Sequence, residues 1–215
     1  MPFDYKRAYP EYYLPPKTPQ ILEIPPMNFL AVRGSGNPNE EGGDYRESIG
    51  LVYAVAYTLR MSARAGHGIE GFFNYVVPPL EGLWRQQGNT AIDLAHKESF
   101  QWISMIRLPE FVTERELEWA VREASQRKKR YFSKVQWFSY SEGLCVQCLH
   151  VGPYDAEPAT IAAMEAYALL QGCALDLSGI RQHHEIYLSD ARRCKAENLK
   201  TVIRLPIRQP PKCAN

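Results

Sequence analysis

The sequence signals of one folding unit occur twice in this chain of 215 residues, and this repetition limits the possible folds more than any other feature. Residues 20–110 and residues 131–208 each read as strand, turn, strand, loop, capped helix, strand, strand. The loop VRGSGNPN precedes the first of these helices, and the loop LHVGPYDAE precedes the second. A repeat of roughly 100 residues is too long for a solenoid array, so it indicates a duplicated unit.

The duplication predicts an α+β fold. Two β-α-β-β units, each with an apolar helix face, are expected to pair into one antiparallel sheet of about eight strands carrying two main helices. The pair would have pseudo-two-fold symmetry and a central cleft where the units meet. Junctions between repeats are common ligand sites, so the cleft is the first place to expect one.

The helix starts are marked by residues that accept hydrogen bonds from free backbone N–H groups. Asp44, Thr113 and Asp155 are expected to cap three helices, and Gly172 is expected to end the last of them. The predicted helices span about 44–61, 113–129 and 155–171. The second of these joins the two units.

The remaining segment boundaries are predicted from the composition of the chain, beginning with the proline- and tyrosine-rich N-terminus. Residues 1–19 predict an extended arm rich in both, residues 20–208 a single domain of two repeats, and residues 209–215 a tail. The segment 71–84, GFFNYVVPPLEGLW, is expected to be a strand.

Aromatic residues exceed what a core of this size requires: 13 tyrosines, 8 phenylalanines and 4 tryptophans. Such rings either pack together or line a pocket for a flat ligand. The candidates for the cleft wall are Trp84, Trp102, Trp137, Tyr53, Tyr57, Phe72, Phe73, Tyr75 and Tyr154. Core packing is the expected role of most of them, with about three or four touching a ligand.

The stretch HHEIYLSD, residues 183–190, places a carboxylate inside an apolar strand. Alternation along the strand puts Glu185 and Tyr187 on one face and His184 on the other. A carboxylate walled by rings would bind a cation or have a raised pKa, and it could activate water while the phenol stabilises an oxyanion. An exposed strand glutamate is the alternative, and spacing alone slightly favours it.

Glu81, in PLEGLW, is a second acid near aromatic residues and a further candidate ligand-binding residue. Taken alone, a turn carboxylate in water is the better interpretation of this position.

Several other chemistries have no support. Lysine plus arginine (25) nearly balance aspartate plus glutamate (24), so no direct nucleic-acid or membrane partner is expected. Cys145 and Cys148 lack a second CxxC pair, and His183 and His184 diverge on a strand, so neither pair predicts a metal site. The glycines at 34–36 lack a dinucleotide fingerprint, and no cofactor is expected.

The location follows from cysteine usage and the N-terminus. Five cysteines without framework spacing indicate reduced thiols, and the N-terminus lacks the order of a signal peptide. A cytoplasmic protein is therefore expected.

Four segments together resemble the GyrI-like small-molecule-binding family, in its stand-alone bacterial branch. They are YVVPPLEGLW, FQWISMIRLPEFVT, LHVGPYDAEPATIAAM and HHEIYLSDARR…NLKTVIRLP, and the resemblance covers about residues 20–208. It implies the duplicated unit and central cleft that the repeat predicts.

The resemblance also implies a site. In the effector-binding domains of multidrug-sensing regulators, an acid on a cleft strand receives hydrophobic cations among aromatic rings. Some stand-alone members are hydrolases that open the cyclopropane of cyclopropanoid DNA-alkylating toxins. The family's acid corresponds to Glu185 and the neighbouring phenol to Tyr187, and its ring positions correspond to Trp84, Trp102, Trp137 and Tyr154. Arg85 departs from the family pattern, which often has an aromatic there, and leaves room for neutral or anionic ligands.

Three functions are consistent with this sequence. The preferred one is binding of flat, aromatic or hydrophobic, often cationic molecules for protection against xenobiotics or toxins. The second is hydrolysis of cyclopropanoid toxins, with Glu185 activating water and Tyr187 polarising the carbonyl. The third is inhibition of DNA gyrase through a protein interface. Only about 20 proline-rich residues precede the first strand, so a DNA-reading module is not expected.

Overall fold

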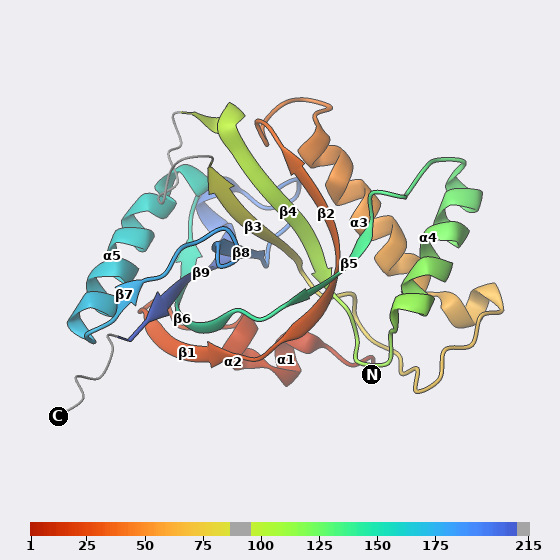
Figure 1. Ribbon diagram of the computed structural model, residues 1–215, viewed down its shortest axis with the longest axis horizontal. Coiled ribbons are helices and arrows are strands. Elements are labelled where there is room, and N and C mark those ends of the chain that lie inside the picture. Colours follow the sequence, from red (N-terminus) through yellow and green to blue (C-terminus); the bar gives the residue numbers. More distant parts are fainter. Residues whose placement is uncertain (87–95, 210–215) are drawn as a thin grey trace.

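A computed structural model describes residues 1–86 and 96–209, and the described chain forms one nine-stranded antiparallel sheet with helices packed against it (Figure 1). The strands are β1 (Gln20–Ile24), β2 (Met27–Ser35), β3 (Leu80–Gln86), β4 (Phe100–Arg107), β5 (Gln136–Tyr140), β6 (Gly143–Val151), β7 (Ala174–Leu175), β8 (His183–Tyr187) and β9 (Lys200–Arg208). The expected α+β class and single antiparallel sheet are confirmed.

The strand order contains the duplication. It is β1-β6-β9-β8-β3-β4-β2-β5, with the short β7 added to β9. When each strand is replaced by its counterpart in the other repeat, the same order is read from the opposite edge of the sheet. The β3–β8 pair lies at the centre of this symmetry. The first strand of each repeat pairs with the other repeat, β1 with β6 and β5 with β2. Pro25 and Pro26 between β1 and β2 cannot form the tight turn of a two-residue hairpin, which needs positive φ.

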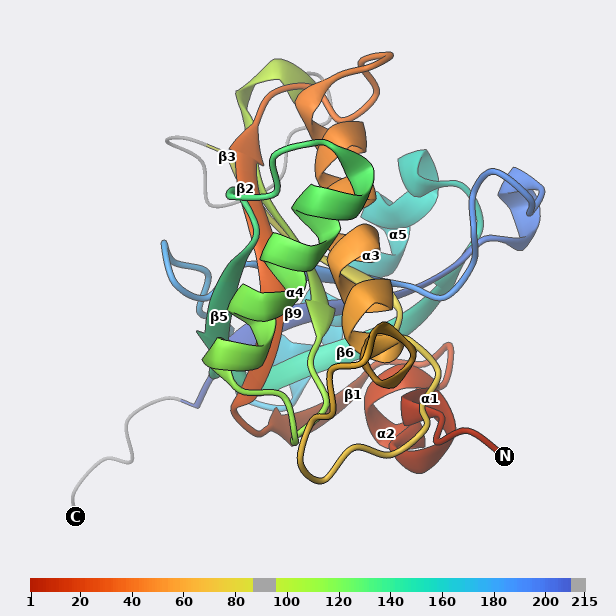
Figure 2. The ribbon, with the colours of Figure 1, turned by 90° about the vertical axis from the view of Figure 1, so that its right-hand side faces the viewer.

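Three main helices cover the sheet, as expected from two units and a joining helix. They are α3 (Asp44–Arg60), α4 (Glu114–Lys128) and α5 (Glu157–Leu170). Figures 1 and 2 show α3 and α4 side by side over the first repeat and α5 over the second. The Thr113 side chain accepts from the backbone N–H of Glu116, so this predicted cap is confirmed. Gly172, at φ +73°, follows α5 as predicted.

The other two predicted caps are wrong. Gly43 holds the N-cap position of α3, so Asp44 already lies inside the helix. Asp155 lies in a 3-10 turn, Tyr154–Ala156, and α5 begins at Glu157 with Ala156 as its N-cap. The helix starts two residues later than predicted, and Glu157 is its first residue.

The N-terminal segment is not the extended arm that its prolines predict. It contains two short helices, α1 (Tyr5–Ala8) and α2 (Pro10–Tyr13). The Asp4 side chain accepts from the backbone N–H of Lys6. Pro10 occupies the first position of α2, where a backbone N–H would have no partner within the helix, so its absence in proline costs nothing. Tyr5 and Tyr13 are buried against Ile186, so the segment belongs to the folded core.

The predicted strand 71–84 is correct only at its end, because β3 begins at Leu80. Gly71 has φ +74°, and Pro78 and Pro79 remove two backbone donors directly before β3. Tyr75 makes a single bridge to Phe3 instead. Among the described residues, the structure contains no helix of the length and hydropathy that a membrane span requires.

The two repeats have separate apolar cores. One lies between β2, β3, β4 and the helices α3 and α4, and the other lies between β6, β9 and α5. The seam between the cores runs over the central β3–β8 pair. The side chains of that pair are therefore free to line a cleft.

Candidate functional site

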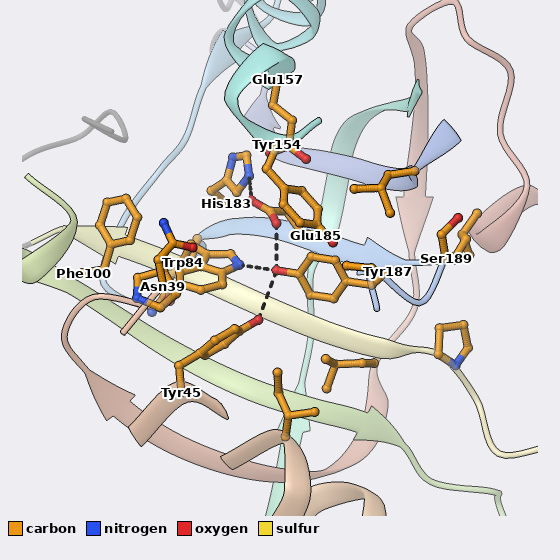
Figure 3. A pocket seen from close by; sticks show the side chains of 18 of the residues that line it. Asn39, Tyr45, Trp84, Phe100, Tyr154, Glu157, His183, Glu185, Tyr187 and Ser189 are labelled. Carbon is orange, nitrogen blue, oxygen red and sulfur yellow. Dashed lines mark hydrogen bonds and ion pairs between the residues drawn. The ribbon is translucent and has the colours of Figure 1, made fainter. Parts of the chain in front are cut away.

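A cleft of about 1740 Å³ opens over the central strand pair, between α3 and α5. Figure 3 shows the side chains at its floor, which come from both repeats. Tyr45 projects from α3, Trp84 from β3, Glu157 from α5, and Glu185 and Tyr187 from β8. The predicted cleft at the seam is present.

Glu185 lies at the centre of the floor and has a hydrogen-bond contact on each carboxylate oxygen. Gly82 faces it on β3, and the Trp84 indole and the Tyr187 hydroxyl occupy the space that a side chain at Gly82 would need. The Tyr187 hydroxyl donates to Glu185 Oε2 at 2.7 Å, and His183 Nε2 lies 3.0 Å from Oε1. The Glu185 side chain is 12% exposed and therefore opens to the cleft while being largely withdrawn from water.

Tyr187 is held by three neighbours. Its oxygen accepts from Trp84 Nε1 at 2.9 Å and from the Tyr45 hydroxyl at 3.4 Å, while its own proton points to Glu185. Burial, followed by the negative charge of Glu185, raises the pKa of Tyr187 well above its usual value. The phenol therefore stays protonated and acts as a hydrogen-bond donor at neutral pH.

Rings form the wall of the cleft. The Tyr45 and Trp84 rings lie 5.0 Å apart, and the Tyr154 and Tyr187 rings meet edge to face at 6.0 Å. Tyr53 lines the cleft one helical turn beyond Ile49. These faces suit a flat or spherical apolar ligand, and their negative π-clouds suit a cation.

The structure brings together five of the eight predicted site residues: Tyr53, Trp84, Tyr154, Glu185 and Tyr187. It does not bring Trp102 or Trp137 to the cleft. Trp102 is buried behind Tyr45, with ring centres 5.3 Å apart. Trp137 lies on β5 at the edge of the sheet and donates to Ser139.

Glu81 lies on the opposite face of the sheet and is 2% exposed, so neither the turn-in-water interpretation nor a place in the cleft is correct. Its Oε2 is 3.0 Å from His184 Nε2. His184 Nδ1 meets Glu142 at 2.9 Å, and Glu142 in turn accepts from Arg204 at 3.1 Å. These four side chains form a buried ionic cluster on the back of the sheet, behind the cleft.

Three residues of the floor escaped sequence reasoning: Tyr45, Glu157 and His183. Glu157 is 6% exposed, and its Oε1 has no hydrogen-bond partner. The segment DAEP gave a signal for it, because a second acid follows the predicted cap by two residues. His183 shares the face of Glu185 by simple alternation.

Basic residues lie at the rim of the cleft. Arg85 reaches it, so the departure from the family pattern bears on the site. Lys97 also lines it and pairs with Asp155 at 3.3 Å. The cleft therefore combines an acidic, aromatic floor with a partly cationic mouth.

Glu157, His183 and Glu185 each bring one side-chain oxygen or nitrogen within 4.8 Å of the others. Both oxygens of Glu185 are already engaged by His183 and Tyr187. His183 and Tyr187 therefore form a hydrogen-bonded cluster around Glu185.

The close packing at Gly82 gives a testable prediction. A Cβ there would lie 2.7 Å from Trp84 Nε1 and 3.1 Å from the Tyr187 hydroxyl. We expect Gly82→Ala to lower the free energy of unfolding by about 1–3 kcal/mol, measured by urea denaturation. The control is Gly50→Ala in α3, where a Cβ meets nothing within 4 Å. It should raise stability by about 0.5–1 kcal/mol; equal effects at both glycines would contradict the prediction.

Comparison with known proteins agrees with this architecture. The family model of the GyrI-like small molecule binding domain matches residues 17–208. A hydrolase from Listeria innocua is 38% identical, with a TM-score of 0.87 over 96% of this chain and 100% of its own. An uncharacterized conserved protein from Listeria innocua is 40% identical, with a TM-score of 0.90 over the same shares of the two chains.

More distant structures share the fold. The C-terminal domain of EcmrR has a TM-score of 0.56 at 13% identity, over 90% of this chain and 98% of that domain. Nothing among the curated proteins matches this chain.

Proposed function

Since the chain belongs to the GyrI-like small molecule binding domain family, we propose that its cleft binds hydrophobic aromatic molecules, preferably cations, with Glu185 as the anchor. The observation that carries the proposal is the environment of Glu185. Its carboxylate is largely buried, walled by rings, and without a lysine or arginine ion pair among residues 1–86 and 96–209. A buried charge of this kind is stabilised when a ligand supplies the opposite charge.

A protective role follows from this chemistry. Lipophilic aromatic cations include many toxic compounds, and a protein that holds them in a cleft of this volume lowers their free concentration. We propose sequestration of such xenobiotics or toxins as the biological use of the site.

Two ions of nearly the same shape test the proposal: the cation tetraphenylphosphonium and the anion tetraphenylborate. Isothermal titration calorimetry should give at least tenfold tighter binding for the cation, equivalent to about 1.4 kcal/mol. Equal affinities would mean that rings and the basic rim, rather than Glu185, select the ligand. Raising the salt concentration should weaken cation binding little, since the acid is shielded from solvent.

Hydrolysis of a cyclopropanoid toxin is the second candidate. The direct Tyr187–Glu185 contact of 2.7 Å and the 38% identical hydrolase from Listeria innocua favour it. Glu185 would take a proton from water as the water oxygen bonds to the ring carbon. The carbon–carbon bond of the cyclopropane breaks, its electrons pass to the conjugated carbonyl oxygen, and Tyr187 stabilises the charge there.

Turnover separates the two candidates. Incubation with a cyclopropanoid alkylator in isotopically labelled water should give a ring-opened alcohol carrying the labelled oxygen, detected by mass spectrometry. Saturable binding without product would leave the sequestering role alone. Gyrase inhibition stays a prediction from the family resemblance.

A further inference from the structure

Glu157 places a second carboxyl beside the anchor. It occupies the first turn of α5, is 6% exposed, and points into the floor of the cleft next to His183 and Glu185 (Figure 3). Its Oε1 is buried and has no hydrogen-bond partner. The proposed binding function gives this side chain no role, although two carboxyls so close together must influence each other.

The hydrogen bonds identify which of the two acids carries the charge. The Tyr187 hydroxyl donates to one oxygen of Glu185, and His183 Nε2 lies 3.0 Å from the other. Tyr187 is fixed as the donor because its oxygen already accepts from Trp84. A carboxylate that accepts a charge-assisted hydrogen bond from such a fixed donor is favoured in its ionised form.

Glu157 has weaker support, from a hydrogen bond with the Thr201 side chain, and its Oε1 has no partner. The titratable or polar groups that face this part of the floor are Glu185, His183 and Tyr187 from β8, Tyr154 and Asp155 from the preceding turn, Tyr45 from α3 and Thr201 from β9. Lys97, which lines the same cleft, pairs with Asp155. Within the described ranges, neither lysine nor arginine forms an ion pair with Glu157. Two adjacent buried carboxyls without a cation cannot both ionise readily.

We propose that Glu157 keeps its proton at neutral pH, so that the cleft floor carries a single negative charge, on Glu185, and is matched to singly charged cations. This proposal rests on the proposed role of Glu185 as anchor, and it specifies in addition that the preferred ligand carries one positive charge. Burial, followed by repulsion from Glu185, raises the pKa of Glu157 and agrees with this assignment.

The first test compares two isosteric variants in tetraphenylphosphonium binding. Glu157→Gln replaces a neutral acid by a neutral amide, so the dissociation constant should stay within about twofold of wild type. Glu185→Gln removes the charge and should weaken binding about 30-fold or more. A comparable loss in both variants would show that Glu157 is also ionised and would overturn the proposal.

The second test needs no ligand, so it stands even if the binding proposal fails. In the unfolded chain Glu157 loses its proton near its ordinary pKa of 4.5, whereas in the folded chain it keeps it. The folded state then binds more protons, and its stability falls as pH rises. Relative to Glu157→Gln, the unfolding equilibrium constant of wild type should increase about tenfold per pH unit between about pH 6 and pH 8.

Comparison with the variant removes the contributions of other titrating groups, which both proteins share. Glu165→Gln, on an exposed position of the same helix, is the matched control and should show a ratio to wild type that does not change with pH. A pH-independent ratio for Glu157→Gln as well would mean that Glu157 is ionised in the folded protein, and it would overturn the proposal. Urea denaturation at three pH values measures all of these ratios.

Discussion

Glu185→Gln is expected to weaken the binding of tetraphenylphosphonium by about 30-fold or more. Truncating one partner of a buried charge pair costs about 2–5 kcal/mol, and 1.4 kcal/mol corresponds to a factor of ten. The amide removes the negative charge and also turns one of the two acceptor atoms into a donor. That donor would then face His183 or the Tyr187 hydroxyl, which donates to Glu185 in the folded protein.

The experiment needs a control for charge and one for folding. Glu165→Gln removes an exposed acid that also lines the cleft, and its effect on affinity should stay below about twofold, because exposed charges are screened. Near-ultraviolet circular dichroism reports whether the tyrosine and tryptophan packing survives. If Glu185→Gln folds correctly and binds tetraphenylphosphonium with unchanged affinity, Glu185 is not the anchor of the ligand.

The same variant decides the catalytic candidate. Because water activation requires the carboxylate, ring-opened product should fall by at least about 100-fold, the usual contribution of a general base. Tyr187→Phe should reduce turnover less and leave tetraphenylphosphonium binding nearly intact, since phenylalanine keeps the ring and the variant keeps the Glu185 carboxylate. If product formation persists in Glu185→Gln, a group other than Glu185 activates the water.

The sequence predicted those parts of the fold that depend on local periodicity. Alternation placed Glu185 and Tyr187 together, and the repeat predicted the single sheet and the cleft at its centre. The pairing of β1 with β6 and of β5 with β2 could not be predicted. Pro25 and Pro26 indicate where β1 ends, but they do not indicate which strand pairs with it. Local signals do not encode which distant segment completes the sheet.

The residues missed or misplaced show the same limit. Trp84 and Trp102 are register partners on neighbouring strands, and both were candidates for the wall. Only Trp84 reaches the cleft, because Tyr45 covers Trp102 from a helix far away in the sequence. Glu81 lies three positions before Trp84 on the same strand and therefore points to the opposite face.

That opposite face contains the ionic cluster of Glu81, Glu142, His184 and Arg204, which joins the two repeats behind the cleft. Glu81 belongs to the first repeat, whereas Arg204 and His184 belong to the second. Arg204 also donates to Gln147 at 3.0 Å and to the backbone carbonyl of Tyr12 in the N-terminal segment. The cluster thus holds β8, and with it Glu185, in register with β3.

Arg204→Met is expected to destabilise the protein by about 3–5 kcal/mol, because it leaves the buried Glu142 carboxylate without one of its two cations. A typical domain has only about 5–15 kcal/mol in total, so the loss is large. Urea denaturation at pH near 6 measures it. Arg122→Met is the matched control, since that residue forms an exposed pair with Glu118 at 3.8 Å and should change stability by less than about 0.5 kcal/mol.

The pKa values of Glu142 and His184 determine how the stability contributed by the cluster changes with pH. Although burial opposes it, the charges of His184 and Arg204 lower the pKa of Glu142 to about 2 from 4.5. The stabilisation is therefore present above about pH 4.5 and is lost as the pH falls toward 2. Burial likewise opposes ionisation of His184, but Glu142 and Glu81 raise its pKa to about 9 from 6.5, so its contribution is lost as the pH rises through that interval.

The difference in unfolding free energy between wild type and Arg204→Met should consequently be fully present above about pH 4.5 and shrink toward pH 2. At low pH a protonated Glu142 no longer requires the guanidinium, and wild type then carries an uncompensated buried cation that the methionine variant lacks. A difference that stays constant over this range, or one no larger than that of Arg122→Met, would mean that the cluster does not stabilise the centre of the sheet electrostatically.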